Sequence, residues 1–176
     1  MTANEKFLNQ RQRYQPVTLP QDFSDEEMAR DWTLSEADQQ EIVKYRKNSR
    51  LFIAIQLCAV QLYGRFLLEV NDLSPRIISY LNGQLDLPPS LTIAMPDRDA
   101  TVSEQCKNIL SYLGFSKYDD EAQARLQAWL EKQAHQGFLP DELFLRAERF
   151  LLSERVVLPG PTVLERVLGK RRWLWL

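Results

Sequence analysis

The sequence predicts an all-α protein, a compact multi-helix bundle of about eight helices around one buried central helix. The central helix is predicted at 50–63, which is too apolar to face water on any side and is followed by Gly64. Several other segments repeat apolar residues at three- and four-residue spacing, as amphipathic helices do. Strand signals are few, and the extended apolar stretch 156–158 has no evident partner strand.

The first half of the chain carries clear helix start signals after a polar segment, 1–20, whose prolines favour an extended arm. Ser24 with Glu27, and Ser35 with Asp38, have the spacing of a capping box, which opens a helix. The predicted helices of this half are 25–30, 36–46, 50–63 and 75–83.

The second half contains the start signals of four further helices. An N-cap is predicted at Thr101 and at Asp119 or Asp120, and Pro140 suits the first position of a helix. The predicted helices are 102–113, 120–136, 140–151 and 162–168. The second and third of these are expected to pack on the central helix with the apolar segments 126–130 and 143–151.

Composition indicates a folded globular protein of one domain, or of two small domains sharing a core. The chain has 176 residues, of which 44% are hydrophobic and 26% charged, and a net charge of −2. That charge argues against a protein that coats nucleic acid by bulk attraction. The charge is uneven, because an acidic segment, 21–41, precedes a basic one, 42–70. Cys58 and Cys106 fit no metal motif or disulfide framework and are expected to be buried free thiols.

No catalytic constellation is evident. The single histidine, His135, is expected near a helix end, where it complements the helix dipole. The sequence has no phosphate-binding loop, dinucleotide fingerprint or HExxH motif. The acidic residues 119–121 could suggest a metal site, but a helix N-cap explains them better. We therefore expect no enzyme activity, no cofactor, no metal and no small-molecule substrate.

A basic block crosses one helix end, a turn and the next helix start. Two helices joined by a tight turn form the geometry that helix-turn-helix proteins place on DNA. Arg and Lys suit phosphates, whereas Asn and Gln can pair with adenine. The alternative is a solvated turn whose cations stabilise the end of the first helix. The candidate DNA-binding residues are Lys44, Arg46, Lys47, Asn48, Arg50, Gln56, Arg65 and Arg76.

The positions of two of these candidates in their helices bear on their roles. Gln56 lies within the buried helix, where satisfying a polar group of the core is the alternative role. Arg76 stands in the first turn of a helix, where a cation is unfavourable for the dipole, so a phosphate partner would explain it. An ordinary surface arginine is the alternative. The acidic segment 21–41 is expected to lie away from the basic face, because it would repel the DNA backbone.

Several spaced blocks resemble the N-terminal domain of class II replicative transposases, the Tn-three family. The similarity spans roughly 23–168. It rests on an entry motif at 31–38, on a later block at 158–166, and on Ile109 with 113–115 between them. The most recognisable block contains Asn48, Arg50, Leu51, Ala54, Gln56, Leu57, Gly64 and Arg65.

The resemblance implies a non-catalytic domain that helps to bind the terminal inverted repeats of a transposon. Strand-transfer chemistry in this family belongs to a later domain with three metal-binding carboxylates, before which this chain is expected to end. The implied partners are double-stranded DNA at transposon ends and other transposase domains or subunits. After Thr101 the family usually has basic residues, whereas here Val102, Ser103 and Gln105 follow.

The implied organisation is an extended arm at 1–20, a helical DNA-binding domain at 21–169 and a basic, aromatic tail at 170–176. The runner-up function is a helical protein–protein or regulatory module without DNA affinity of its own. No secretory signal precedes the acidic segment, and the apolar run 51–63 is too short to span a bilayer. A cytoplasmic protein, associated with the nucleoid when bound to DNA, is therefore expected.

Overall fold

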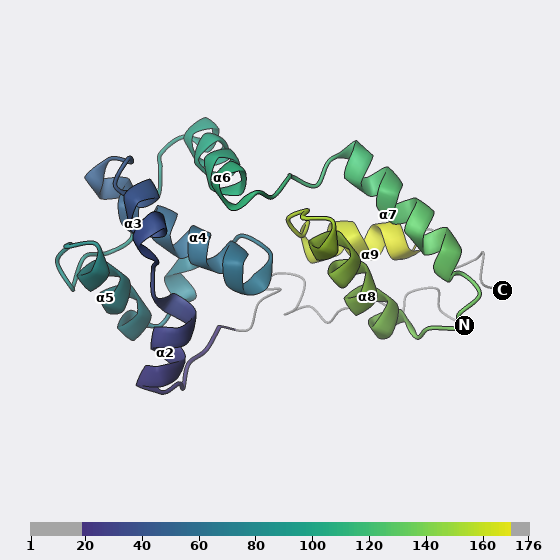
Figure 1. Ribbon diagram of the computed structural model, residues 1–176, viewed down its shortest axis with the longest axis horizontal. Coiled ribbons are helices and arrows are strands. Elements are labelled where there is room, and N and C mark those ends of the chain that lie inside the picture. Colours follow the sequence, from purple (N-terminus) through teal and green to yellow (C-terminus); the bar gives the residue numbers. More distant parts are fainter. Residues whose placement is uncertain (1–18, 170–176) are drawn as a thin grey trace. The chain divides into compact units, whose positions relative to one another are not determined.

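The structure is a computed structural model that describes residues 19–169 (Figure 1). These residues form eight α-helices, two 3-10 helices and no β-strand, which confirms the predicted all-α class. The helices are α2 (Asp25–Trp32), α3 (Glu36–Ile42), α4 (Arg50–Tyr63), α5 (Pro75–Gln84), α6 (Asp99–Leu113), α7 (Asp120–Gln133), α8 (Pro140–Ser153) and α9 (Pro161–Gly169), with 3-10 helices η1 (Lys47–Ser49) and η2 (Val70–Asp72). The predicted tail 170–176, and all but two residues of the predicted arm, lie outside the described residues.

The described chain divides into two compact units, which separate between Leu113 and Gly114. The first unit, within 19–113, contains α2 to α6, and the second, within 114–169, contains α7 to α9. Each unit has its own cluster of buried hydrophobic side chains. We refer to them below as the first and the second unit.

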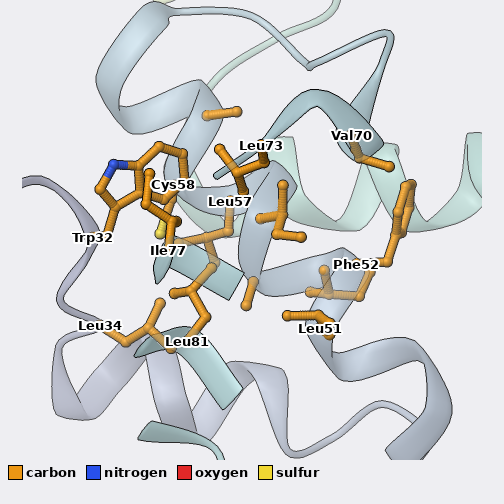
Figure 2. Packing of buried hydrophobic residues seen from close by; sticks show 14 of the residues in the cluster. Trp32, Leu34, Leu51, Phe52, Leu57, Cys58, Val70, Leu73, Ile77 and Leu81 are labelled. Atoms are coloured by element: carbon orange, nitrogen blue, oxygen red, sulfur yellow. The ribbon is translucent and has the colours of Figure 1, made fainter. Parts of the chain in front are cut away.

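Helix α4 is the centre of the first unit. Residues 51 to 60 are all buried, so the helix has no solvent-exposed face along this stretch. The helices that cover it are α2, α3, α5 and α6. Figure 2 shows Leu57, Cys58 and Phe52 of α4 packed among side chains of the surrounding elements. The helix ends at Gly64, whose φ of 70° lies in the left-handed region that glycine adopts without strain.

The second unit corrects one packing prediction. The apolar residues around 126–130 and 143–151 were expected to pack on α4, but they belong to the core of the second unit. There Leu126 and Leu130 of α7 and Leu151 of α8 are buried with residues of α9. Helices α7 and α8 are amphipathic, and their apolar faces pack against each other. Helix α4 is covered instead by four helices of the first unit.

Most predicted helix starts are correct. Ser24 and Ser35 both form complete capping boxes, and the Asp119 side chain accepts a hydrogen bond from the Ala122 amide. The predicted cap at Thr101 is wrong, because α6 already begins at Asp99, whose carboxylate suits the first turn of a helix. The stretch 156–158 does have a partner in the described chain, since Val156 forms an isolated parallel bridge with residue 116.

Candidate nucleic-acid interface

The turn between α3 and α4 is built by Arg50. The Arg50 Nε donates to the carbonyl oxygen of Tyr45, and its Nη2 donates to that of Val43, both at 3.0 Å. Carbonyls that follow a helix have no partner inside it, and a guanidinium supplies several donors in one plane. These bonds hold the chain in a turn from residue 43, so the helix predicted at 36–46 ends at Ile42. The Arg50 side chain therefore has a structural role in the first unit.

The turn presents cations and one amide to solvent. Lys44, Arg46, Lys47 and Asn48 are all exposed. Lys44 Nζ lies 2.7 Å from a carboxylate oxygen of Glu41. Among the described residues, Arg46 and Lys47 form no ion pair, so their charges remain available to an outside partner.

The Glu41–Lys44 pair corrects the expectation that the whole acidic segment lies away from the basic residues. Glu41 is the last acidic residue of that segment and stands three positions before Lys44, within reach along one helical turn. An exposed pair of this kind contributes at most about 1 kcal/mol, so Lys44 can exchange its partner at low cost.

Gln56 and Arg65 are buried, with exposed fractions of 4% and 6%, so neither belongs to the solvent-facing surface of the first unit. The Gln56 amide donates to the carbonyl oxygen of Leu67 at 2.9 Å and accepts from the Leu67 backbone amide at 2.8 Å. Gln56 thus ties the centre of α4 to the segment that follows it, which is the alternative role considered from the sequence.

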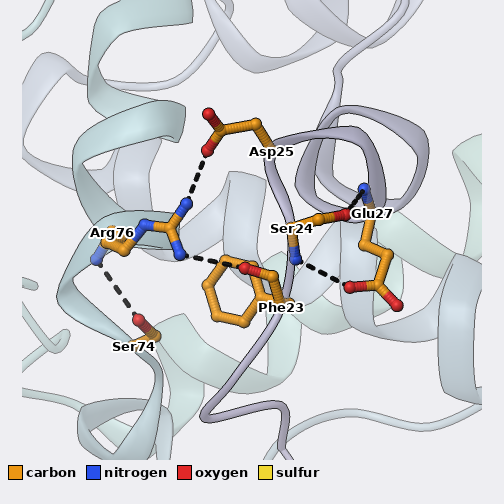
Figure 3. A network of polar contacts seen from close by, with 6 residues as sticks. All are labelled: Phe23, Ser24, Asp25, Glu27, Ser74 and Arg76. Carbon is orange, nitrogen blue, oxygen red and sulfur yellow. Dashed lines mark hydrogen bonds and ion pairs between the residues drawn. The ribbon is translucent and has the colours of Figure 1, made fainter.

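Arg76 has partners within the first unit (Figure 3). Its Nη2 lies 2.6 Å from a carboxylate oxygen of Asp25, and its Nη1 donates to the carbonyl oxygen of Phe23 at 3.0 Å. The guanidinium also lies over the Phe23 ring, 4.7 Å from the centroid. These contacts join the start of α5 to the start of α2. They explain a cation in the first turn of α5 without a phosphate.

A polar groove of about 630 Å³ lies beside the turn, within the first unit. One side is formed by the turn residues Lys44, Tyr45, Arg46 and Asn48. The other is formed by the segment 94–98 and by side chains of α6. Those that carry charge or an amide are Asp97, Arg98, Glu104, Gln105 and Asn108.

Sequence reasoning did not find the far side of the groove. Arg98, Gln105 and Asn108 lie about fifty to sixty residues after the turn, and no local pattern links the two segments. The one available signal was the departure from the resembled transposase pattern after Thr101, where Val102, Ser103 and Gln105 stand in place of the expected basic residues and histidine. Of the three departing residues, Gln105 lines the groove, whereas Val102 and Ser103 do not.

Comparison with known proteins assigns the family. A family model described as "Domain of unknown function (DUF4158)" matches residues 7–170, which is most of the chain. The chain belongs to this family. It is 28% identical over 175 residues to the transposase for transposon gamma-delta of Escherichia coli (strain K12). It is 25% identical over 142 residues to the transposase for transposon Tn1546 of Enterococcus faecium.

These alignments confirm the resemblance to class II transposases. They cover 94% and 80% of this chain, but only 17% and 14% of the two transposases. The chain therefore corresponds to a small part of each relative.

The residues considered from the sequence for catalysis or metal binding have structural explanations. His135 is exposed just after α7, and Asp119 caps that helix. Within residues 19–169, no group of three or more His, Cys, Asp or Glu side chains could hold a metal ion. Burial raises the pKa of the Cys58 thiol to about 12 and also raises the pKa of half-buried Cys106. Both thiols are thus protonated at neutral pH and are poor nucleophiles.

No described helix is both long and apolar enough to cross a membrane.

Proposed function

We propose that this chain is a non-catalytic DNA-binding domain that recognises the terminal inverted repeats of a transposon. The observation that carries the proposal is the exposed cationic turn. Arg46 and Lys47 project from it without an ion pair among the described residues, in a chain similar to two transposases. Lys44 and Asn48 flank them, and Arg98 adds a cation across the groove.

In the proposed mechanism, different residues hold the DNA backbone and recognise the bases. Lys44, Arg46 and Lys47 neutralise phosphates and release condensed counterions, which supplies affinity for any DNA sequence. Asn48 is the amide on the turn that can pair with an adenine edge. Arg50, Gln56, Arg65 and Arg76 act indirectly, because their side chains are buried or hold the turn and helix starts in place.

The experiment is a titration of the purified chain against transposon-end and random-sequence duplexes at low and moderate salt. Binding to both at low salt, with preference for the transposon end and a steep loss as salt rises, is the expected result. Negligible binding to both at low salt would eliminate the DNA proposal. In the same preparation we expect no magnesium- or manganese-dependent nicking, and nicking lost on substituting Asp119 and Asp120 would show that the chain is catalytic.

A second candidate function is a helical protein–protein module that regulates a transposase. The observation in its favour is exposed apolar surface on α8, where Leu139 precedes the helix and is 72% exposed and Leu145 is 56% exposed. Exposed large apolar side chains are a feature of surfaces that bind another protein when they form a patch. Absence of DNA binding, together with association with a transposase that is lost in Leu139→Ser, would support this candidate over the first.

A further inference from the structure

The segment that joins α5 to α6 carries a run of unpaired backbone groups (Figure 1). Its last part, 94–98, forms one side of the groove beside the turn. From 91 to 96 the chain makes no turn or bend. No residue from 92 to 97 forms a hydrogen bond within the part of the chain that the structure describes. The backbone amides and carbonyls of this run are therefore available to another molecule.

The side chains of this segment alternate as those of a β-strand do. Leu91 and Ile93 pack against the core of the first unit, whereas Thr92 and Ala94 are exposed. A period of two residues is that of extended backbone, and threonine and isoleucine are common in strands. The core thus holds the segment in a strand-like conformation, although residues 19–169 contain no strand to pair with it.

The sequence of this segment does little to protect its edge. Natural proteins protect exposed strand edges with charged side chains and with proline. Here no residue from 87 to 96 is charged, and the prolines stand only at 88, 89 and 96. The residues between them, 90–95, can all donate a backbone hydrogen bond. The segment is therefore open to pairing with another strand.

The length of this edge limits what can occupy it. A stable interface between two folded proteins buries about 1,200 Å² or more. The flanking prolines restrict pairing to 90–95, which spans about 20 Å and would bury much less than that between two copies of the chain. An extended peptide can bury further surface in the adjoining groove, whose volume is about 630 Å³. A slender peptide strand therefore suits the edge better than a second folded copy.

The charges of the groove favour a peptide over a strand of DNA. The groove is lined by two cations, Arg46 and Arg98, and by two carboxylates, Asp97 and Glu104. None of the four forms an ion pair with another described residue. The carboxylates repel a DNA phosphate, whereas a peptide can carry side chains of both signs. A peptide backbone also supplies a donor and an acceptor at each residue, which the unpaired segment can use.

We propose that residues 92–95 bind an extended peptide of a partner protein by β-strand addition, with side chains of the peptide lying in the groove. In this mode of recognition, main-chain hydrogen bonds supply affinity and the side chains that enter pockets supply specificity. The lining of the groove fits a peptide in which apolar residues alternate with residues of both charges. The inference goes beyond the proposed DNA binding and does not depend on it.

The test adds a short synthetic peptide, in which valine alternates with glutamate and lysine, to the full chain. The measurement is hydrogen exchange of single backbone amides, followed by NMR. Successive amides of a strand point to opposite edges, so only alternate amides between 92 and 95 should become protected. Their exchange should slow about tenfold near saturation. Of two control peptides, N-methylated at alternate residues in opposite phase, only one should bind.

Two proline variants test the same edge from the side of the chain. Ala94→Pro and Met95→Pro each remove one amide donor, and these two donors point to opposite edges of the segment. Both side chains are exposed and neither amide is hydrogen-bonded in the described chain, so both variants should melt near the temperature of the unsubstituted chain. One variant should lower the affinity for the peptide about tenfold or more, and the other should lower it less.

The remaining outcomes would overturn this inference while leaving the proposed DNA binding intact. The first is no binding of the peptide, and the second is binding that leaves the amides of 92–95 unprotected. Full affinity in both proline variants is the third. Protection that rises with the concentration of the chain alone would assign the edge to a second copy. Protection of the same amides by a transposon-end duplex would assign the groove to DNA instead of a peptide.

Discussion

The two units differ in what they bury. All six buried polar or charged residues of the described chain belong to the first unit, and the core of the second is apolar. Those residues are Asp38, Gln56, Arg65, Ser74, Asn82 and Gln105. Burying a polar group costs free energy unless it is hydrogen-bonded, so such groups are retained where they fix one conformation or serve a function. The first unit is therefore the better place to look for a binding site.

The largest expected effect tests whether each unit depends on its own core. Leu57→Ala in α4 and Leu126→Ala in α7 each remove a fully buried side chain and should each cost about 2–5 kcal/mol. Hydrogen exchange resolved by segment should show lost protection in α4 for the first variant and in α7 for the second. A cost below about 1 kcal/mol for Leu57→Ala would contradict the central position of α4.

The next prediction concerns the buried polar groups that have partners. Gln56→Leu leaves both the amide and the carbonyl of Leu67 without their partner, at a cost of about 1–3 kcal/mol for each group. Gln61→Leu, on the exposed part of the same helix, is the matched control and should cost little. Equal denaturant midpoints for the two variants would show that the Gln56 bonds do not stabilise the first unit.

A pH titration tests a second polar contact of the first unit. Burial, together with the hydrogen bond that its hydroxyl donates to Asp38 at 2.8 Å, raises the pKa of Tyr112 to about 12. An unfolded tyrosine has a pKa of about 10, so the folded state holds this proton more tightly. Stability from this group is complete below about pH 10 and is lost as pH rises toward 12.

Comparing the unsubstituted chain with Tyr112→Phe isolates that contribution. The free energy of unfolding should fall more steeply between pH 10 and 12 in the unsubstituted chain than in Tyr112→Phe. In this range only the unsubstituted chain releases the proton of the Tyr112 hydroxyl when it unfolds. Parallel pH profiles for the two proteins would contradict the assignment.

The smallest expected effect concerns exposed ion pairs. Removing one such pair should lower the free energy of unfolding by a similar, small amount in either unit. Arg76→Ala removes the Asp25 pair and the contact with Phe23 in the first unit, and Arg125→Ala removes the Glu154 pair in the second. Each should cost up to about 1 kcal/mol, as exposed pairs do. A loss several times larger for Arg76→Ala, measured by thermal unfolding, would mean that this contact organises the whole first unit.

The sequence predicts those features that depend on local chemistry. Capping residues such as Ser24, Ser35 and Asp119 act on amides three positions away, so their spacing alone reveals a helix start. The burial of α4 follows in the same way from its lack of a polar face.

Features that depend on distant partners were not predictable from the sequence. The apolar faces of α7 and α8 could have covered α4, and no local pattern states which neighbour an amphipathic helix selects. Arg65 stands directly after a glycine cap, where exposure is common, but it is buried. The candidate site was found only on its near side, since Arg98 and Gln105 meet the turn through folding.

The most direct test of the central claim asks whether DNA affinity comes from the turn or from charge anywhere on the chain. The double variant Arg46→Ala/Lys47→Ala removes two exposed cations from the turn. Lys132→Ala/Arg149→Ala removes two exposed cations from the second unit and changes the net charge equally. The measurement is the slope of log K against log salt concentration for a transposon-end duplex. The turn variant should reduce that slope by about 1.8, from about 0.9 for each lost phosphate contact, and the control should leave it unchanged. Equal slopes for the two double variants would contradict a DNA-binding role for the turn.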